Sequence, residues 1–395
     1  MTNPTTDSTT DMTTYQASMP THAGVCSLRH GRIEPPPEYA HILPAEVDHD
    51  TLTARLHGYG YALVKVADAD EMHPLQEAFD DLAKALRPDL PGAAHCARGI
   101  GGITKHFGAA STRASMEARL GDVGLRAKEV FSTLFGTDRL VVSMDAPTLL
   151  PETDVHACGK ARAPAPVDSA QTEYRKRVGS KLPLHVDISQ AGEAMESSMQ
   201  KLVAHGQLKF GYAVQGQLVV HGVPKNGSTI VLVPGKYTRA SYVNEVGCKF
   251  ESSTRDFRVC KQRAYDEFVV SAVALEPPAG TLLLWLSRTP HGNKIADNGV
   301  TEKRAGQFVC WMPACLEDEA TRAATKLHKY DAVCAGRSTD HWPVQSPLEK
   351  RKLSLTGGNH YSNGQKKTKV LVSKESPGGA QLWGDALNAA CYDAC

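Results

Sequence analysis

The stretch PPAGTLLLWLSRTPHGN, residues 277–293, decides the fold class. Within it, TLLLWL at 281–286 is an almost wholly apolar run, which a Pro-Pro-Ala-Gly turn precedes and which Pro290 and His291 follow. A short apolar run bounded by glycine and proline is typical of a buried β-strand. The sequence therefore predicts a buried strand that leads through a turn to a histidine.

Short, largely apolar runs of this kind recur after residue 140, separated by glycine and proline. They predict strands at residues 140–144, 184–188, 210–220, 228–233, 268–275, 281–286 and 307–312. Before residue 140, alternating residues predict a strand at 59–66. Apolar residues at helical spacing predict helices at 52–56, 70–86 and 113–134. Many short strands after a few helices favour a mainly β fold with flanking helices (α+β), of the β-sandwich or jelly-roll kind.

Composition and charge limit the functions that the chain can serve. Its 395 residues are 41% apolar and 22% charged, which excludes a coiled coil, a collagen and wholesale disorder. A net charge of +1 is smaller than a dedicated nucleic-acid binder usually carries. Ten cysteines without a C-x-x-C pair argue against a zinc ribbon or a disulfide scaffold. With no apolar run of about 18 residues and no signal peptide, we expect a cytoplasmic or nuclear protein without a membrane partner.

Three parts of the chain differ in composition. Residues 1–50 are rich in threonine and proline, which predicts a disordered, Pro-rich segment. Residues 51–345 contain all the predicted helices and strands, so we expect one domain there, interrupted by a long polar lid loop at 151–181. Residues 346–395 are basic and rich in Gly and Ser, as in a tail. The oligomeric state is left open.

The segment KLPLHVDISQ, residues 181–190, contains the chain's only H-x-[DE] motif, His185 and Asp187. Residues i and i+2 of an extended segment project from the same face, so the imidazole and the carboxylate would lie side by side. A second histidine would complete a two-His-one-carboxylate triad, which leaves three coordination positions open for iron(II) oxygenase chemistry. The alternative is a surface histidine beside a solvated aspartate.

The second histidine must come from a strand further along the chain. His291 is favoured because it follows the buried strand at 281–286 and is itself followed by a turn. His221 also ends an apolar run, but it lies only 34 residues after Asp187, too few strands for the chain to return to the same metal. The other downstream candidates are His205, His328, His341 and His360.

Arg304 comes 13 residues after His291 and opens the next predicted strand. A hairpin partner would return it beside the metal, where a guanidinium can hold a carboxylate through two hydrogen bonds. The alternative is an exposed arginine beside Lys303. The full order of H-x-D, histidine and arginine is more specific than any of its parts.

This order of motifs resembles the phytanoyl-CoA dioxygenase-like branch of the Fe(II)/2-oxoglutarate oxygenases over residues 52–345. The resemblance rests on a G-Y-x-x-V strand at 60–64, LHVD at 184–187, the hairpin VQGQLVVHGVPKNGSTIVLVPGKY at 214–237 and the stretch at 277–293. The chain departs from the family at Lys236 and Tyr237, where Ser and His are common. It also has Asn293 where a serine or threonine often assists the 2-oxoglutarate carboxylate.

The resemblance implies a double-stranded β-helix (jelly roll, cupin-like) that binds Fe(II) through His185, Asp187 and His291. It implies that 2-oxoglutarate chelates the iron and that Arg304 pairs with its distal carboxylate. Gln215 either reaches the C1 carboxylate of 2-oxoglutarate or is a structural amide. The implied reaction uses O2, releases succinate and CO2 and hydroxylates a C–H bond, with ascorbate as reductant. An acid at 187 favours hydroxylation over halogenation, because related halogenases have a small residue there.

The substrate is not defined by these motifs, and we expect a small molecule or an acyl derivative. Acyl-CoA hydroxylation follows only from analogy with the family. One alternative is an oxygenase that modifies nucleic acid and holds phosphates with the basic tail, at Lys350, Arg351, Lys352, Lys366, Lys367 and Lys369. Another is a jelly-roll protein that binds a metal without catalysis. Arg98, Lys105 and His106 would meet an anionic substrate or would simply be solvated.

Overall fold

The computed structural model describes residues 40–85, 109–145, 147–150, 184–188, 190–225, 227, 229–238, 258–259, 272–294, 304–334 and 343–344. The segment at 1–39, the expected lid loop at 151–181 and the expected tail at 346–395 lie outside the described residues. None of the described helices is both long and apolar enough to cross a membrane.

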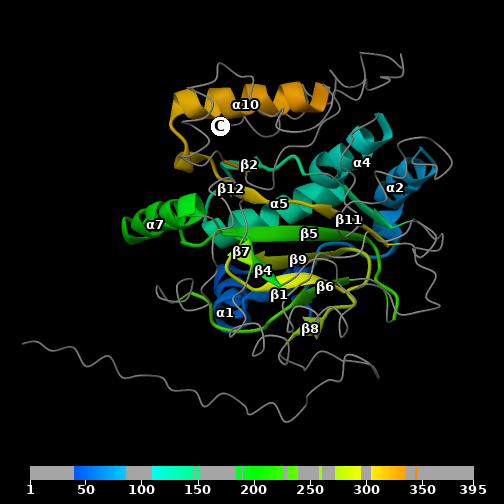
Figure 1. Ribbon diagram of the computed structural model, residues 1–395, viewed down its shortest axis with the longest axis horizontal. Helices are drawn as coiled ribbons and strands as arrows, with labels where there is room; N and C mark the ends of the chain where they lie inside the picture. The colour runs from blue at the N-terminus through cyan, green and yellow to red at the C-terminus, as the bar shows by residue number, and fades with distance from the viewer. Residues whose placement is uncertain are drawn as a thin grey trace, which may run out of the picture.

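Two five-stranded antiparallel sheets form the centre of the molecule (Figure 1). The first has the order β1 (Tyr61–Lys65), β9 (Thr281–Leu286), β5 (Val214–His221), β11 (Arg304–Phe308) and β3 (Pro147–Leu150). The second has the order β7 (Arg258–Val259), β4 (His185–Val186), β10 (His291–Lys294), β6 (Thr229–Leu232) and β8 (Val273–Ala274). A separate pair joins β12 (Trp311–Pro313) to β2 (Leu140–Val142).

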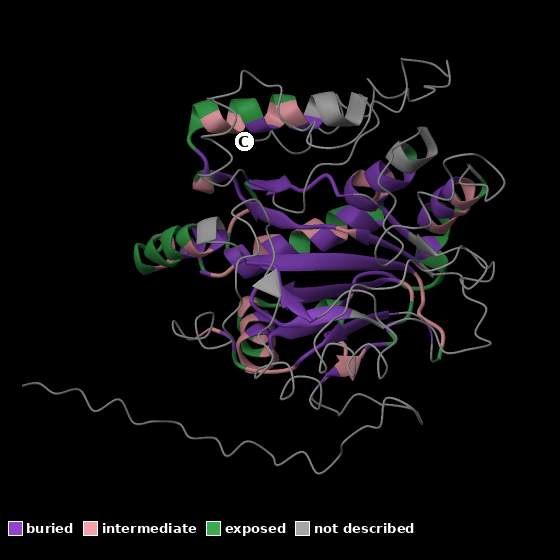
Figure 2. Ribbon diagram, in the orientation of Figure 1, coloured by how far each residue is buried: buried purple, intermediate pink, exposed green. Residues whose placement is uncertain are grey.

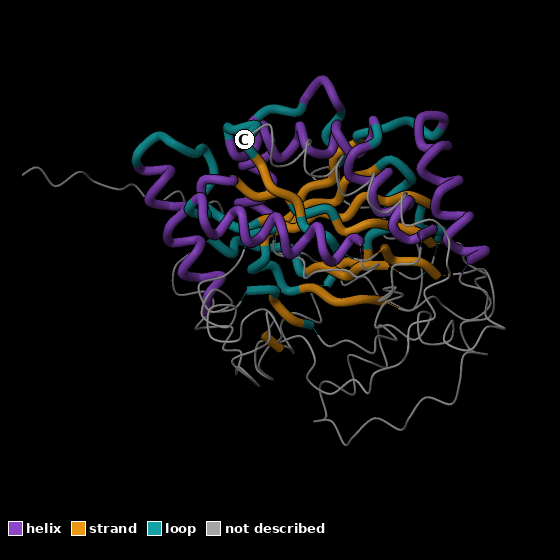
Figure 3. The backbone as a smooth tube through the Cα atoms, turned by 90° about the horizontal axis from the view of Figure 1, so that it is seen from above, coloured by secondary structure: helices purple, strands orange, loops and turns teal. Residues whose placement is uncertain are grey.

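Helices pack around the strands (Figure 3). They are α1 (His49–Tyr59), α2 (His73–Ala85), α4 (Ala109–Leu120), α5 (Asp122–Phe135), α7 (Gln190–Ala204) and α10 (Glu319–Cys334), with 3-10 turns at Pro44–Glu46, Asp70–Met72 and Ala314–Leu316. The last helix, α10, lies outermost over the β12–β2 pair, where the Lys329 ammonium on α10 donates to the carbonyl of Val142 at 2.6 Å. The described part is thus an α+β arrangement of antiparallel sheets with packed helices, as the sequence predicted.

The central strand β9 is buried on both faces (Figure 2). Leu282, Leu284 and Leu286 join the large core that the helices cover. The alternate residues Leu283 and Trp285 join a smaller core that also contains Ile230 and Leu232 of the second sheet. Because each fully buried leucine contributes about 1.5–3 kcal/mol, a strand inside two cores is selected to be continuously apolar. This explains why TLLLWL shows no alternation of apolar and polar residues.

Several predicted elements have different boundaries in the structure. The predicted helix at 113–134 is two helices, α4 and α5, because Gly121 lies between them in an extended conformation with φ −69° and ψ 169°. The predicted strand at 307–312 is also divided, since β11 belongs to the first sheet and β12 to the small pair. The sequence did not predict α7, α10, β3 or β10. The predicted strand at 281–286 is confirmed as β9.

Gly60 follows the last residue of α1 and is hydrogen-bonded to the segment that precedes His291. It has φ +80°, and its carbonyl accepts hydrogen bonds from the Leu286 amide at 3.0 Å and the Thr289 hydroxyl at 2.7 Å. A Cβ on Gly60 would lie 2.7 Å from that hydroxyl and 2.8 Å from Cδ2 of Tyr237. Only glycine therefore fits both the backbone conformation and the available space.

We expect Gly60→Ala to destabilise the protein more than Gly206→Ala. Gly206 also has a positive φ, +70°, but a Cβ there would meet no atom within 4 Å. In the Gly206 variant the free energy of unfolding should fall by about 1 kcal/mol, because alanine is strained in the left-handed backbone conformation. In the Gly60 variant the free energy of unfolding should fall by a further ~1–3 kcal/mol, because the new methyl group would also crowd its neighbours. Urea unfolding followed by circular dichroism measures both, and equal losses would contradict the role of the close approach.

Candidate metal centre

The pairing of β4 with β10 brings two histidines together. His185 and His291 are direct partners in this antiparallel pair, and directly opposed residues project from the same face of a sheet. Their rings lie with centroids 4.3 Å apart and planes at 47°. On the other sheet, Trp285 lies beside His291, with ring centroids 5.6 Å apart. The site is therefore located between the two sheets.

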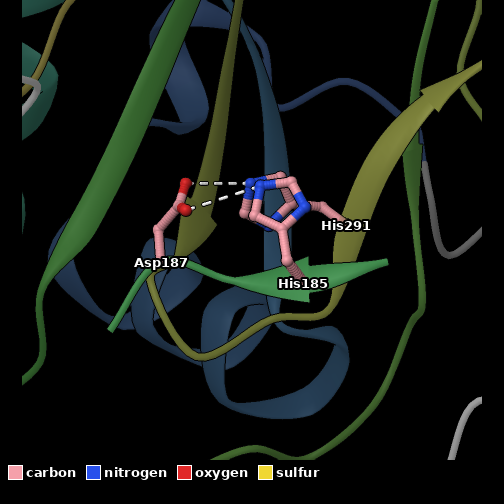
Figure 4. Close-up of side chains that lie close together, drawn as sticks. All are labelled: His185, Asp187 and His291. Carbon is pink, nitrogen blue, oxygen red and sulfur yellow. Dashed lines mark hydrogen bonds and ion pairs between the residues drawn. The ribbon is translucent and has the colours of Figure 1, made fainter. Parts of the chain in front are cut away.

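Asp187 lies on the same face as His185. The alternate residues Leu184, Val186 and Ile188 enter the large apolar core, and this alternation directs His185 and Asp187 to the other side. The Asp187 oxygens lie 3.5 Å from Nε2 of His185 and 3.0 Å from Nε2 of His291 (Figure 4). All three residues are buried, with exposed fractions of 6–8%.

Neighbouring groups fix the orientation of two of these side chains. Nδ1 of His291 lies 2.9 Å from the carbonyl oxygen of Thr289. A carbonyl only accepts, so Nδ1 carries the proton and Nε2 faces the carboxylate. On the other side, the Gln215 amide donates to Oδ2 of Asp187 at 3.0 Å. Outer contacts of this kind orient the ligands of metal sites.

The three donor groups fit a divalent cation. One ligand atom from each residue lies within 4.8 Å of the other two, and this is the group with metal-ligand geometry among the described residues. With a proton on Nδ1, His291 directs Nε2 to the Asp187 oxygens. Electron-rich atoms this close and this buried require a shared proton or a cation between them. Two imidazole nitrogens and one carboxylate oxygen are a donor set that iron(II) accepts.

The other residues singled out in the sequence have different positions. His221 pairs with Asp80 of α2, with Nε2 and Oδ1 3.1 Å apart, and does not belong to the cluster. The Gln215 amide donates to Asp187. Arg304 opens β11 opposite Leu150, and Asn293 lies in β10 opposite Ile230. The side chains of Arg304 and Asn293 lie outside the described part of the structure.

Sequence reasoning missed a buried ion pair between Glu196 of α7 and Arg288 of the turn after β9. Glu196 lies on a helix that the sequence did not predict, and Arg288 is 92 residues away from it. The one available signal was an arginine directly after a fully apolar run, because a charged residue there needs a partner.

Comparisons with known proteins found similarity in structure but not in sequence. No protein-family model and no curated protein matches the sequence. Among solved structures, the chain is similar to the GlcNAc-inducible gene 2 product of Candida albicans, at 14% identity and TM-score 0.48, covering 91% of this chain and 86% of that one.

Two further solved structures are similar to the chain. One is the epimerase SnoN in complex with Fe³⁺, alpha ketoglutarate and nogalamycin RO, at 16% identity and TM-score 0.40, covering 77% of this chain and 96% of that one. The other is EctD from S. alaskensis with 2-oxoglutarate and 5-hydroxyectoine, at 15% identity and TM-score 0.39, covering 68% and 77%. For this chain, the assignment of a metal centre rests on its own side chains.

We expect one divalent metal ion to bind per chain through the three side chains. Titration with Co²⁺, followed by its visible absorption, should reach one equivalent in the wild type. Asp187→Ala and His291→Ala should weaken binding by more than the roughly 10–100-fold that loss of an outer-shell partner costs. His221→Gln, which keeps a hydrogen-bonding group for Asp80, should bind as the wild type does. Normal Co²⁺ binding by His291→Ala would contradict the assignment.

Proposed function

We propose that the protein is an Fe(II)- and 2-oxoglutarate-dependent dioxygenase that hydroxylates a C–H bond of an organic substrate, a small molecule or an acyl derivative. The observation that carries this proposal is the buried cluster of His185, Asp187 and His291. Such a triad occupies one face of the metal and leaves positions for a chelating cosubstrate and for O2. A site that serves structure alone is usually closed by a fourth protein ligand, and no fourth His, Cys, Asp or Glu joins the group among the residues that the structure describes.

The three triad residues would hold the iron, and the metal would supply the oxygen chemistry. When bound, it supports the oxidative decarboxylation of 2-oxoglutarate to succinate and CO2 that accompanies hydroxylation. The chain's own contribution is binding and orientation. The Thr289 carbonyl holds the proton of His291 on Nδ1, and Gln215 holds the Asp187 carboxylate against rotation.

Water exclusion is the second contribution of the chain. Trp285 lies beside His291, and the smaller core between the sheets adds Leu63, Leu283 and Ile230, all at most 5% exposed. An apolar wall beside a metal centre strengthens the electrostatic interactions within it and keeps water from side reactions. We expect the two sheets to be the halves of a double-stranded β-helix, because both contribute side chains to this small core.

The phytanoyl-CoA dioxygenase-like branch remains the proposed family. The order of motifs supports it: His185 lies on β4, His291 on β10, and Arg304 opens β11. Arg304 is the proposed anchor for the distal carboxylate of 2-oxoglutarate, with Asn293 as a further cosubstrate contact. The tail that a nucleic-acid substrate would require lies outside the described residues.

Turnover of 2-oxoglutarate tests the proposed reaction. Purified protein with Fe(II), 2-oxoglutarate, ascorbate and O2 should release succinate, and a panel of small metabolites and acyl derivatives should contain compounds that accelerate the release. Chelation should abolish it, and His291→Ala should lack it while remaining folded. A wild-type protein that binds metal but forms no succinate with any compound would instead be a metal-binding protein without this activity.

Replacement of Arg304 tests the cosubstrate anchor. A charge-assisted hydrogen-bonded pair contributes about 1.5–3 kcal/mol, and each factor of ten corresponds to about 1.4 kcal/mol. Arg304→Ala should therefore raise the KM for 2-oxoglutarate roughly 10- to 100-fold without changing Co²⁺ binding. Arg304→Lys should restore it in part, because lysine is a point charge without the planar fork. An unchanged KM for 2-oxoglutarate in Arg304→Ala would show that another cation binds the distal carboxylate.

A further inference from the structure

A fully buried carboxylate joins segments that lead to the proposed metal centre without belonging to it. Glu196 of α7 has no exposed side-chain surface, and its Oε2 lies 2.5 Å from Nε of Arg288, whose side chain is 8% exposed. Arg288 belongs to the short turn between β9 and β10, and its guanidinium carbon lies 5.7 Å from the ring centroid of Tyr212. The pair is thus enclosed by helix, turn and aromatic ring.

The second oxygen of the same carboxylate holds another segment. Oε1 of Glu196 accepts a hydrogen bond from the backbone amide of Ala213 at 3.1 Å. The carbonyl of Ala213 accepts in turn from the Ser287 amide at 2.9 Å. One side chain therefore connects α7, the residue that precedes β5, and the turn after β9.

Each of these segments carries one part of the proposed metal centre. The helix α7 begins three residues after Asp187. The strand β5 carries Gln215, which donates to Asp187. The turn leads into His291 and contains Thr289, the acceptor for the Nδ1 proton of His291. The position of Asp187 relative to His291 thus depends on segments that Glu196 holds together.

A buried ion pair of this kind is not explained by its contribution to the stability of the fold. Replacing a buried ion pair by apolar residues of similar volume is often neutral or stabilising, whereas removing one partner leaves an uncompensated charge. Burial raises the pKa of Glu196 to about 7, and the nearby Arg288 opposes the increase. The carboxylate is therefore ionised and paired at mildly alkaline pH.

We propose that Glu196 and Arg288 are positioning residues of the metal centre, whose ion pair sets the placement of His291 relative to Asp187 and thereby the affinity for the metal. This role rests on the proposed function, since it requires the triad to bind a metal. Neither residue is a ligand, and both act through the segments that they join.

A Co²⁺ titration at pH 8 tests this role, with the dissociation constant and the visible spectrum as readouts. Glu196→Gln keeps the shape and an acceptor for Ala213 but removes the charge. It should raise the dissociation constant roughly 10–100-fold, as loss of outer-shell partners does, and should alter the Co²⁺ bands. Arg288→Lys should restore affinity partly relative to Arg288→Ala. Glu71→Gln is the matched control, because it breaks the exposed Arg126 ion pair and should change neither readout.

A double variant keeps the test valid if the single changes unfold the protein. Glu196→Leu with Arg288→Met replaces both charges by apolar groups and should remain folded, with weakened Co²⁺ binding and altered bands. Wild-type affinity and spectrum in Glu196→Gln or in the double variant would overturn the positioning role alone. A wild type that binds no Co²⁺ would overturn the metal centre itself.

Discussion

One pair of opposed residues, His185 on β4 and His291 on β10, determines the arrangement of the proposed centre. Strand alternation then places Asp187 on the same face, and the flanking apolar residues fix that face by entering the core. A shift of this register by one residue would turn the imidazole of one strand away from the other. Gln215 and Trp285 approach the same point from neighbouring strands of the opposite sheet, where they are direct partners. The geometry of the site is thus a property of pairing between strands far apart in the sequence.

The centre also balances charge within a small buried volume. Asp187 has two imidazoles and an amide around it. Arg288, in the turn that leads to His291, is paired with Glu196. A desolvated carboxylate beside two imidazoles favours either a proton or a metal ion. Metal binding and proton release are therefore linked at this site.

Sequence patterns predicted the elements that are strongly periodic or strongly apolar. The run TLLLWL predicted β9 with both of its boundaries. The H-x-D motif together with His291 predicted the three residues of the cluster. The sequence failed where tertiary pairing overrides local preference. HGNK has no strand signal of its own, and it becomes β10 because β4 and β6 pair with it. Glycine at 121 divided a helix whose apolar period runs through it. Glu196 could not be identified because its partners lie on two other segments.

The position of β1 in the first sheet affects how the chain acquires its structure during synthesis. Within its sheet this strand pairs with β9, Tyr61 facing Trp285, and more than 200 residues separate these partners. At roughly 5–20 residues per second, a ribosome needs on the order of 10–45 seconds to make the intervening chain. During that interval β1 lacks the sheet partner that covers this edge in the folded protein. A nascent chain that stops before β9 would expose an unpaired strand edge, and such edges are templates for aggregation.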